Sequence, residues 1–288
     1  MNIILIVLLG LVLTLVESRI TRGNLGTIYN GYGAIPGVLD RTALHPMRHR
    51  VLMAWIVGWL PETMTWRAIP VRALAYQAVK GVFITAALLA AYFCAYDRSM
   101  VSVLALALLV MVTMEFDYWD CYMELAGAAV CLTGDVIAAT LVMPLWATSR
   151  ETWALGAVLV ALASGNFTDA VPVLMMGGLW YAMVWHVQGP APLYSRRWAM
   201  KAYNWNDLRR CIYFRPDSGP ALAILWTLAT LAAVVFGRGL MPEHLARAAW
   251  VAVAWLVAGW LMGRAREVRV FLPTAVWMGA VIGGMLTW

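Results

Sequence analysis

The sequence predicts an all-α fold, a polytopic transmembrane helical bundle that forms a single transmembrane domain over residues 1–288. The first observation is composition: 63% of the 288 residues are apolar and 12% are charged, whereas a soluble domain has about 45–50% and about 25%. The second is a mean hydropathy of +0.75. The third is that the apolar runs are solid, as in residues 101–114, which favours helices over the alternating strands of a transmembrane barrel.

The same figures exclude several classes of protein. This apolar content is too high for a soluble enzyme, a disordered chain or a disulfide scaffold. The formal charge of +6 and the pI of about 9.3 are attributed to arginine-rich loop ends that face anionic headgroups, so nucleic acid is not expected as a partner. The four cysteines form no CxxC pair, and we interpret them as buried, inert thiols.

Nine to eleven hydrophobic segments follow one another along the chain, several of them short or broken. Residues 3–16 have no basic residue before them and no small-residue cleavage site after them, which predicts a retained helix rather than a signal peptide. Residues 51–60 are too short to cross a membrane unless the helix extends backwards through residues 45–50, so we expect a tilted span or an interfacial helix. The remaining segments cover residues 73–96, 100–114, 121–132, 136–148, 153–164, 171–187, 220–236, 248–263 and 270–288.

Two polar loops interrupt these segments. Residues 17–50 are rich in glycine and predict a long irregular loop. Residues 188–219 form a basic loop. The positive-inside rule places this loop, the basic turn at 264–269 and the basic first loop in the cytoplasm, whereas the acidic turn at 115–120 looks non-cytoplasmic, and the predicted spans do not satisfy all of these placements.

The densest group of charges is EFDYWDCYME at residues 115–124. Asp117, Asp120 and Glu124 share one face if this segment is helical. Carboxylates so close together need a cation, a basic partner or a proton. The functional interpretation is a site for a sugar hydroxyl or a metal-bound diphosphate, or a general base. The structural interpretation is a capped helix that meets arginines of a neighbouring loop.

Further charges stand at the ends of apolar runs. Arg48 and Arg50 are spaced for bidentate capture of phosphate or for anchoring at headgroups. Arg150 lies in a Ser-Arg-Glu-Thr turn, for which an ion pair within a helical hairpin is the preferred interpretation, with Ser149 as a candidate cap. Glu267 and Arg269 either anchor a helix or point into the bundle.

Isolated charges have simpler interpretations. Lys80 lies inside an apolar run and either snorkels or pairs with an acidic residue across the bundle. Asp135 and Asp169 follow turn residues and are expected to cap helices. The sequence contains no Walker loop, no dinucleotide-binding glycine fingerprint, no GxSxG and no HExxH, and its four histidines lack metal-ligand spacing. No dedicated metal site is predicted, although a divalent cation near Asp117 and Asp120 stays open.

Several of these clusters, taken in order, resemble a known family. They read PMRHRVL at residues 46–52, FDYWD at 116–120, SRET at 149–152, NWNDL at 204–208 and EVRVFLP at 267–273. The order resembles that of GT-C-type polytopic membrane glycosyltransferases, which take a sugar from a polyprenyl-phosphate carrier. The likeness covers residues 45 to 273. The chain is shorter than typical members, lacks a soluble C-terminal domain, and has no acidic residue near residues 29–32, where a catalytic aspartate is expected.

The resemblance implies inverting sugar transfer at the outer face of a bacterial inner membrane. It implies a polyprenyl-phosphate-linked sugar and membrane lipid as partners. Such transfer needs a base at the acceptor hydroxyl and a cationic clamp on the departing phosphate. The expected catalytic residues are Asp40, Asp117 and Asp120. The expected substrate-binding residues are Arg48, Arg50, Glu124, Arg150, Glu267 and Arg269.

Two other functions stay open. One is a non-catalytic integral membrane subunit or scaffold of a larger complex, with protein partners in the membrane; it predicts that the polar clusters pair among themselves. The other is a transporter of a lipid or small molecule, for which short, broken segments are typical, although no internal repeat is found.

Overall fold

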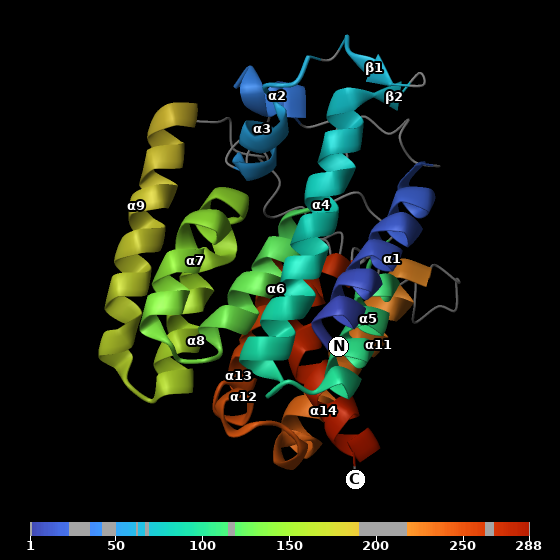
Figure 1. Cartoon of the computed structure of the whole chain (residues 1–288). Coiled ribbons are helices and arrows are strands. Elements are labelled where there is room, and N and C mark those ends of the chain that lie inside the picture. Colours follow the sequence, from blue (N-terminus) through green and yellow to red (C-terminus); the bar gives the residue numbers. More distant parts are fainter. Residues whose placement is uncertain are drawn as a thin grey trace.

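A computed structural model describes residues 2–22, 35–41, 50–61, 63–66, 69–114, 119–189, 218–262 and 268–287. The described chain is all-α apart from one short antiparallel hairpin, in which Thr65 pairs with Pro70 and Trp66 pairs with Ile69. The helices lie side by side in one bundle, and Figure 1 shows their order in space. This confirms that the fold is all-α.

The elements follow the predicted hydrophobic segments closely. Short elements are α2 (Ile35–Leu39), α3 (Leu52–Val57), β1 (Thr65–Trp66), β2 (Ile69–Pro70), η2 (Ala91–Ala95), η3 (Glu151–Trp153), η4 (Phe167–Asp169), η5 (Arg238–Leu240), α12 (Glu243–Arg247) and η6 (Val268–Thr274). The longer helices are α1 (Asn2–Arg22), α4 (Val71–Ala90), α5 (Met100–Val112), α6 (Asp120–Cys131), α7 (Val136–Ser149), α8 (Ala154–Ser164), α9 (Ala170–Gln188), α11 (Ser218–Phe236), α13 (Ala249–Met262) and α14 (Ala275–Thr287).

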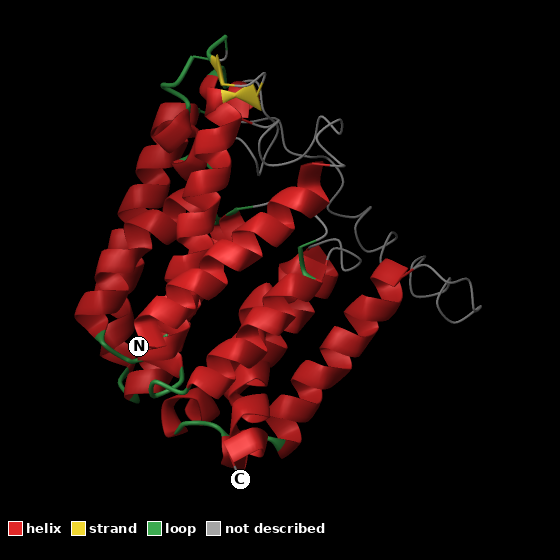
Figure 2. Cartoon of the chain, turned by 45° about the vertical axis from the view of Figure 1, so that its right-hand side comes forward, coloured by secondary structure: helices red, strands yellow, loops and turns green. Residues whose placement is uncertain are grey.

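The longer helices run in alternating directions through the bundle. Toward the top of Figure 1, α1 and α9 end and α4 begins. The short helices α2 and α3 and the hairpin lie there as well. We call this the polar end. α5, α7 and α13 also end toward the polar end, and α4, α6, α8 and α11 end toward the opposite end (Figure 1). Figure 2 shows the bundle from another side, with the strands at the polar end and the C-terminus at the opposite end. Side-chain contacts agree: Asn2 at the start of α1 donates a hydrogen bond to the hydroxyl of Tyr92, just beyond the end of α4.

Turn chemistry at the opposite end matches the predicted caps only in part. The Asp135 carboxylate accepts hydrogen bonds from the backbone N–H groups of Ile137 and Ala138, and so caps α7 as predicted. Asp169 makes no side-chain cap on α9. The Asp169 carboxylate instead accepts a hydrogen bond from the side-chain amide of Asn166. The side-chain oxygen of Asn166 in turn caps the preceding short helix η4.

Among the described residues, two helices are long and apolar enough to cross a membrane. They are α4 with its π-helical extension, Val71–Ala95, and η4 with α9, Phe167–Gln188. Much of α9 is exposed along apolar side chains such as Leu174, Met175 and Leu179. Seven further apolar helices are shorter: Asn2–Ser18, Met100–Val112, Val136–Ser149, Ala154–Ser164, Ala221–Phe236, Ala249–Leu261 and Phe271–Thr287.

Two predicted boundaries need correction. The polar loop expected from residue 17 does not begin there, because α1 continues to Arg22. Glu17 lies inside this helix, where it is buried against Lys80 of α4. Of the two interpretations of residues 51–60, the tilted span is not supported, because α3 begins at Leu52 and ends at Val57. Six helical residues extend about 9 Å, far less than the thickness of a bilayer core, which is about 30 Å. The interfacial helix stays a prediction.

Candidate functional site

The centre of the candidate site is the first turn of α6. This helix begins at Asp120, and Glu124 follows one turn later on the same face. A carboxylate at a helix N-terminus is favoured by the helix dipole. The two residues are 1% and 0% exposed. Burial of two carboxylates this close together is expected only where cationic side chains offset their charges.

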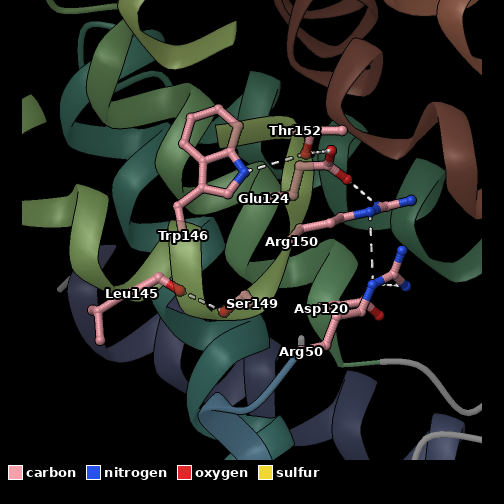
Figure 3. Close-up of polar contacts among 8 residues, drawn as sticks. All are labelled: Arg50, Asp120, Glu124, Leu145, Trp146, Ser149, Arg150 and Thr152. Carbon is pink, nitrogen blue, oxygen red and sulfur yellow. Dashed lines mark hydrogen bonds and ion pairs between the residues drawn. The ribbon is translucent and has the colours of Figure 1, made fainter. Parts of the chain in front are cut away.

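Arg50 supplies the first of these cations. It lies two residues before α3, and its Nη1 donates to Oδ2 of Asp120 over 2.7 Å. Figure 3 shows the guanidinium beside the carboxylate. The Arg50 side chain is 10% exposed. Two charged residues separated by 70 positions in the sequence are therefore in direct contact at a nearly buried place.

Arg150 supplies the second cation and joins both carboxylates. Its Nη1 contacts Oε2 of Glu124, and its Nε lies 3.6 Å from Oδ2 of Asp120. The side chain is 8% exposed. Arg150 has an extended backbone, with φ −158° and ψ 145°, because α7 ends at Ser149 and the chain turns into η3. This extended residue directs the guanidinium toward α6, as Figure 3 shows.

Neutral side chains complete the hydrogen bonding around Glu124. The hydroxyl of Thr152 donates to Oε1 of Glu124. Nε1 of Trp146 lies 3.4 Å from the same hydroxyl and donates to it. The Trp146 indole packs so closely on Gly127 of α6 that a Cβ there would overlap the ring. The close approach of α6 and α7 therefore positions both of these neutral groups.

The Ser-Arg-Glu-Thr turn differs from its sequence interpretation. The Ser149 hydroxyl donates back to the carbonyl of Leu145, one turn earlier in α7, and does not cap the next helix. Arg150 forms ion pairs across to α6. The side chain of Glu151 lies outside the described residues, so the pair within the hairpin stays a prediction. Thr152 and Trp146 were missed as parts of the cluster, because a hydroxyl and an indole among apolar residues carry no distinctive sequence signal.

We call Arg50, Asp120, Glu124, Arg150, Thr152 and Trp146 the charge cluster. Its two guanidiniums and two carboxylates balance formally. Taking charges out of water costs several kcal/mol per ion, and direct ion pairs with further hydrogen bonds offset this cost. Each guanidinium carries five N–H donors in a planar fork, and carboxylates hold such forks in one orientation. The arrangement can therefore present oriented guanidiniums to an anion, or can serve purely to join α3, α6 and α7.

Other predicted site residues lie apart from the charge cluster or outside the described residues. Asp40 is exposed at the end of α2, and no hydrogen bond or ion pair between described residues joins it to the cluster. Arg48, Asp117 and Glu267 lie outside the described residues. The backbone of Arg269 lies in η6, which packs against α6, while its side chain lies outside the described set. The roles assigned to these residues stay predictions.

A second buried ion pair lies between α1 and α4. Nζ of Lys80 lies 2.6 Å from Oε2 of Glu17, and both side chains are fully buried. The ammonium also stands 5.1 Å from the centre of the Tyr76 ring, in cation–π geometry. Of the two interpretations of Lys80, pairing across the bundle is confirmed. The acidic partner was not predicted, because Glu17 was placed in a loop.

Metal binding finds no support in the part of the chain that is described. No three His, Cys, Asp or Glu side chains come together there. The suggested divalent cation near Asp117 and Asp120 rests on Asp117, which lies outside that part. Asp120 itself is in contact with two guanidiniums, which supply positive charge where a cation would.

Comparisons with protein-family models, with curated proteins and with solved structures find no match to this chain. The resemblance to GT-C-type glycosyltransferases therefore rests on the order of the sequence motifs. The geometry of the charge cluster is an independent observation.

Proposed function

We propose that this chain is a multi-pass protein of a bacterial inner membrane. The two long apolar helices support this, as do the shorter ones that lie beside them. Leu141 of α7, Leu108 of α5 and Leu225 of α11 are all more than half exposed. Large apolar side chains on the outer surfaces of several helices are expected where the surrounding medium is lipid. The nine to eleven predicted spans include the shorter helices and belong to this proposal.

We further propose that the charge cluster binds the phosphate of a polyprenyl-phosphate-linked sugar, and that the protein is a glycosyltransferase of GT-C-like type. The observation that supports this proposal is that charged side chains from distant parts of the sequence meet at one place. Arg50, Asp120 and Arg150 come from three separate segments and meet at one nearly buried place beside the polar end. Two guanidiniums held by carboxylates are suited to the geometry of a phosphate group.

The proposed chemistry divides between the two kinds of charge. A carboxylate, with Asp120 as the described candidate, accepts the proton of the acceptor hydroxyl as its oxygen forms the new bond to the anomeric carbon. The bond from that carbon to the carrier phosphate breaks, and the phosphate oxygen leaves with the electron pair. Arg50 and Arg150 stabilise the negative charge that develops on this oxygen. For the base to act, Asp120 must exchange an arginine contact for the acceptor.

A specific observation favours a second candidate function. Each described charge of the cluster contacts an opposite charge within the protein. This is the arrangement expected of a non-catalytic membrane subunit, in which buried ion pairs fix the packing of helices. Under this alternative the cluster binds no lipid phosphate, and its substitution changes stability alone.

Binding measurements on the purified protein separate the two candidates. We expect saturable binding of a radiolabelled short-chain polyprenyl phosphate to the full-length chain. Arg50→Ala should lose a hydrogen bond to a charged group, worth about 1.5–3 kcal/mol, and so raise Kd about tenfold or more. Arg50→Lys keeps the charge but loses the planar fork, and should weaken binding less.

The control is Arg247→Ala. Arg247 is half-exposed at the opposite end, where its Nε lies 3.9 Å from Glu243, and its loss should leave Kd unchanged. The thermal midpoint of each variant is measured beside Kd, so that loss of binding through unfolding is recognised. Absence of saturable binding by the stable native protein would support the subunit and contradict the enzyme.

A further inference from the structure

The chain segments that connect the helices differ in basic content according to the end of the bundle at which their bordering helices begin or end. Of the 21 Lys and Arg residues, Arg98, Arg238 and Arg247 lie in the connections at the opposite end, and Lys80 lies within α4. All the others belong to segments that α1, α4, α7, α9, α11, α13 and η6 border at the polar end. These segments are residues 19–72, Arg150, residues 196–215 and residues 264–269.

The alternating helix directions resolve the conflict among the sequence signals for orientation. The described helix ends that border the first loop, the acidic turn, the basic loop and the basic turn all lie toward the polar end (Figure 1). The acidic turn therefore does not mark a separate side. The positive-inside rule counts Lys and Arg, while Asp and Glu contribute little, so these segments together indicate one orientation.

We propose that the polar end faces the cytoplasm. The charge cluster then lies on the cytoplasmic side of the membrane, and a phosphate-bearing ligand reaches it from that side. This inference deepens the proposed function and rests on it for the ligand. It differs from what the sequence resemblance implies, which is transfer at the outer face. The ligand chemistry is a phosphate ester, and we assign it to a lipid whose headgroup lies in the cytoplasmic leaflet, because the apolar outer surface of the bundle adjoins the lipid chains.

Cysteine labelling tests the orientation without any ligand. The native cysteines at positions 94, 121, 131 and 211 are replaced by alanine, and single cysteines are introduced by Thr63→Cys at the polar end and Gly239→Cys at the opposite end. Both positions are exposed, and a side chain at Gly239 meets nothing within 4 Å. In sealed right-side-out spheroplasts, a membrane-impermeant maleimide should label Gly239→Cys, and Thr63→Cys only after permeabilisation. The reverse pattern overturns the orientation.

A second measurement avoids the cysteine substitutions. Because α14 ends at the opposite end (Figure 1), an alkaline phosphatase joined after residue 288 should be active, and a green fluorescent protein joined there should be dark. A fluorescent fusion with an inactive phosphatase fusion overturns the proposal. Neither readout depends on catalysis or on lipid binding. A failure of the orientation proposal can therefore be distinguished from a failure of the proposed enzyme function.

Sealed vesicles of defined orientation test the side from which the ligand enters. A short-chain polyprenyl phosphate should bind saturably to inside-out vesicles. Binding to right-side-out vesicles should be lost relative to the inside-out ones. Binding only to right-side-out vesicles overturns cytoplasmic access. Inorganic phosphate is added as a competitor in a further arm. Complete competition at the concentration of the lipid probe would show that a free anion is the ligand and would overturn the assignment to a lipid headgroup.

Discussion

At the scale of single residues, Asp120 determines how the charge cluster is arranged. One of its oxygens lies 2.7 Å from Nη1 of Arg50 and 3.6 Å from Nε of Arg150. Glu124 contacts Arg150 and accepts from Thr152. Asp120 is therefore the carboxylate that both guanidiniums approach, and it links the segment before α3 to the turn after α7.

Asp120→Asn tests this arrangement through stability. The amide keeps the shape of the side chain but removes the charge, so two buried guanidiniums lose part of their compensation. Breaking a buried pair by removal of one partner costs about 3–5 kcal/mol, and a marked fall in the thermal midpoint is expected. Differential scanning fluorimetry in detergent measures it.

The matched control is Glu243→Gln, which removes the carboxylate of an exposed pair at the opposite end. An exposed pair contributes about 0–1 kcal/mol, so this variant should melt close to the native protein. Equal midpoints for the Asp120 variant and the control would show that the two arginines are not held by Asp120.

At the scale of elements, the pairing of α1 with α4 depends on both shape and charge. Gly81 of α4 faces Thr14 of α1, and Gly10 of α1 faces Thr85 of α4. Small residues at these places let the two helix backbones approach closely, as is usual between helices in membranes. The Glu17–Lys80 pair lies in the same interface and fixes the register of the two helices.

Substitutions of Glu17 and Lys80 should show strong coupling between their effects on the free energy of unfolding. Lys80→Met leaves the Glu17 carboxylate buried without its ammonium and should destabilise the protein by about 3–5 kcal/mol. Glu17→Leu should destabilise it in the same way. The double variant should recover most of the loss, because replacing a buried ion pair by apolar side chains is often neutral or stabilising. Additive losses in the double-mutant cycle would contradict a direct pair.

At the scale of the whole molecule, the described helices place the charge cluster toward the polar end and large apolar side chains such as Leu141 and Leu225 on the outer surface. We expect the protein to stay in the membrane pellet after an alkaline carbonate wash and to be released by detergent. The measurement is an immunoblot of pellet and supernatant, with a peripheral membrane protein as the control that carbonate does release. Release of this chain by carbonate would contradict an integral membrane protein.

The positions of the helices were largely predictable from the sequence. Apolar runs such as residues 100–114 and 136–148 became α5 and α7 with shifts of one or two residues at their ends. The exceptions have physical causes. Polar residues next to an apolar run are assigned to a loop, yet Glu17 stays helical because Lys80, distant in the sequence, neutralises it inside the bundle.

The candidate site was predictable in its members more than in its contacts. Arg50, Asp120, Glu124 and Arg150 were chosen because charges in an apolar chain are scarce and costly to bury. The sequence interpretation placed the ion pair of Arg150 within its own hairpin. The tertiary structure shows ion pairs from Arg150 to α6 as well, which the sequence did not predict because they depend on distances between helices.

The sequence by itself determined that the chain is helical, that it is rich in apolar segments, and roughly where most of the longer described helices lie, because composition and local hydropathy act over short stretches of chain. Only the tertiary structure decided which charges meet. Local patterns set the cost of burying an ion such as Arg150 or Lys80, but the compensating partner comes from another helix, and its identity depends on how the helices pack.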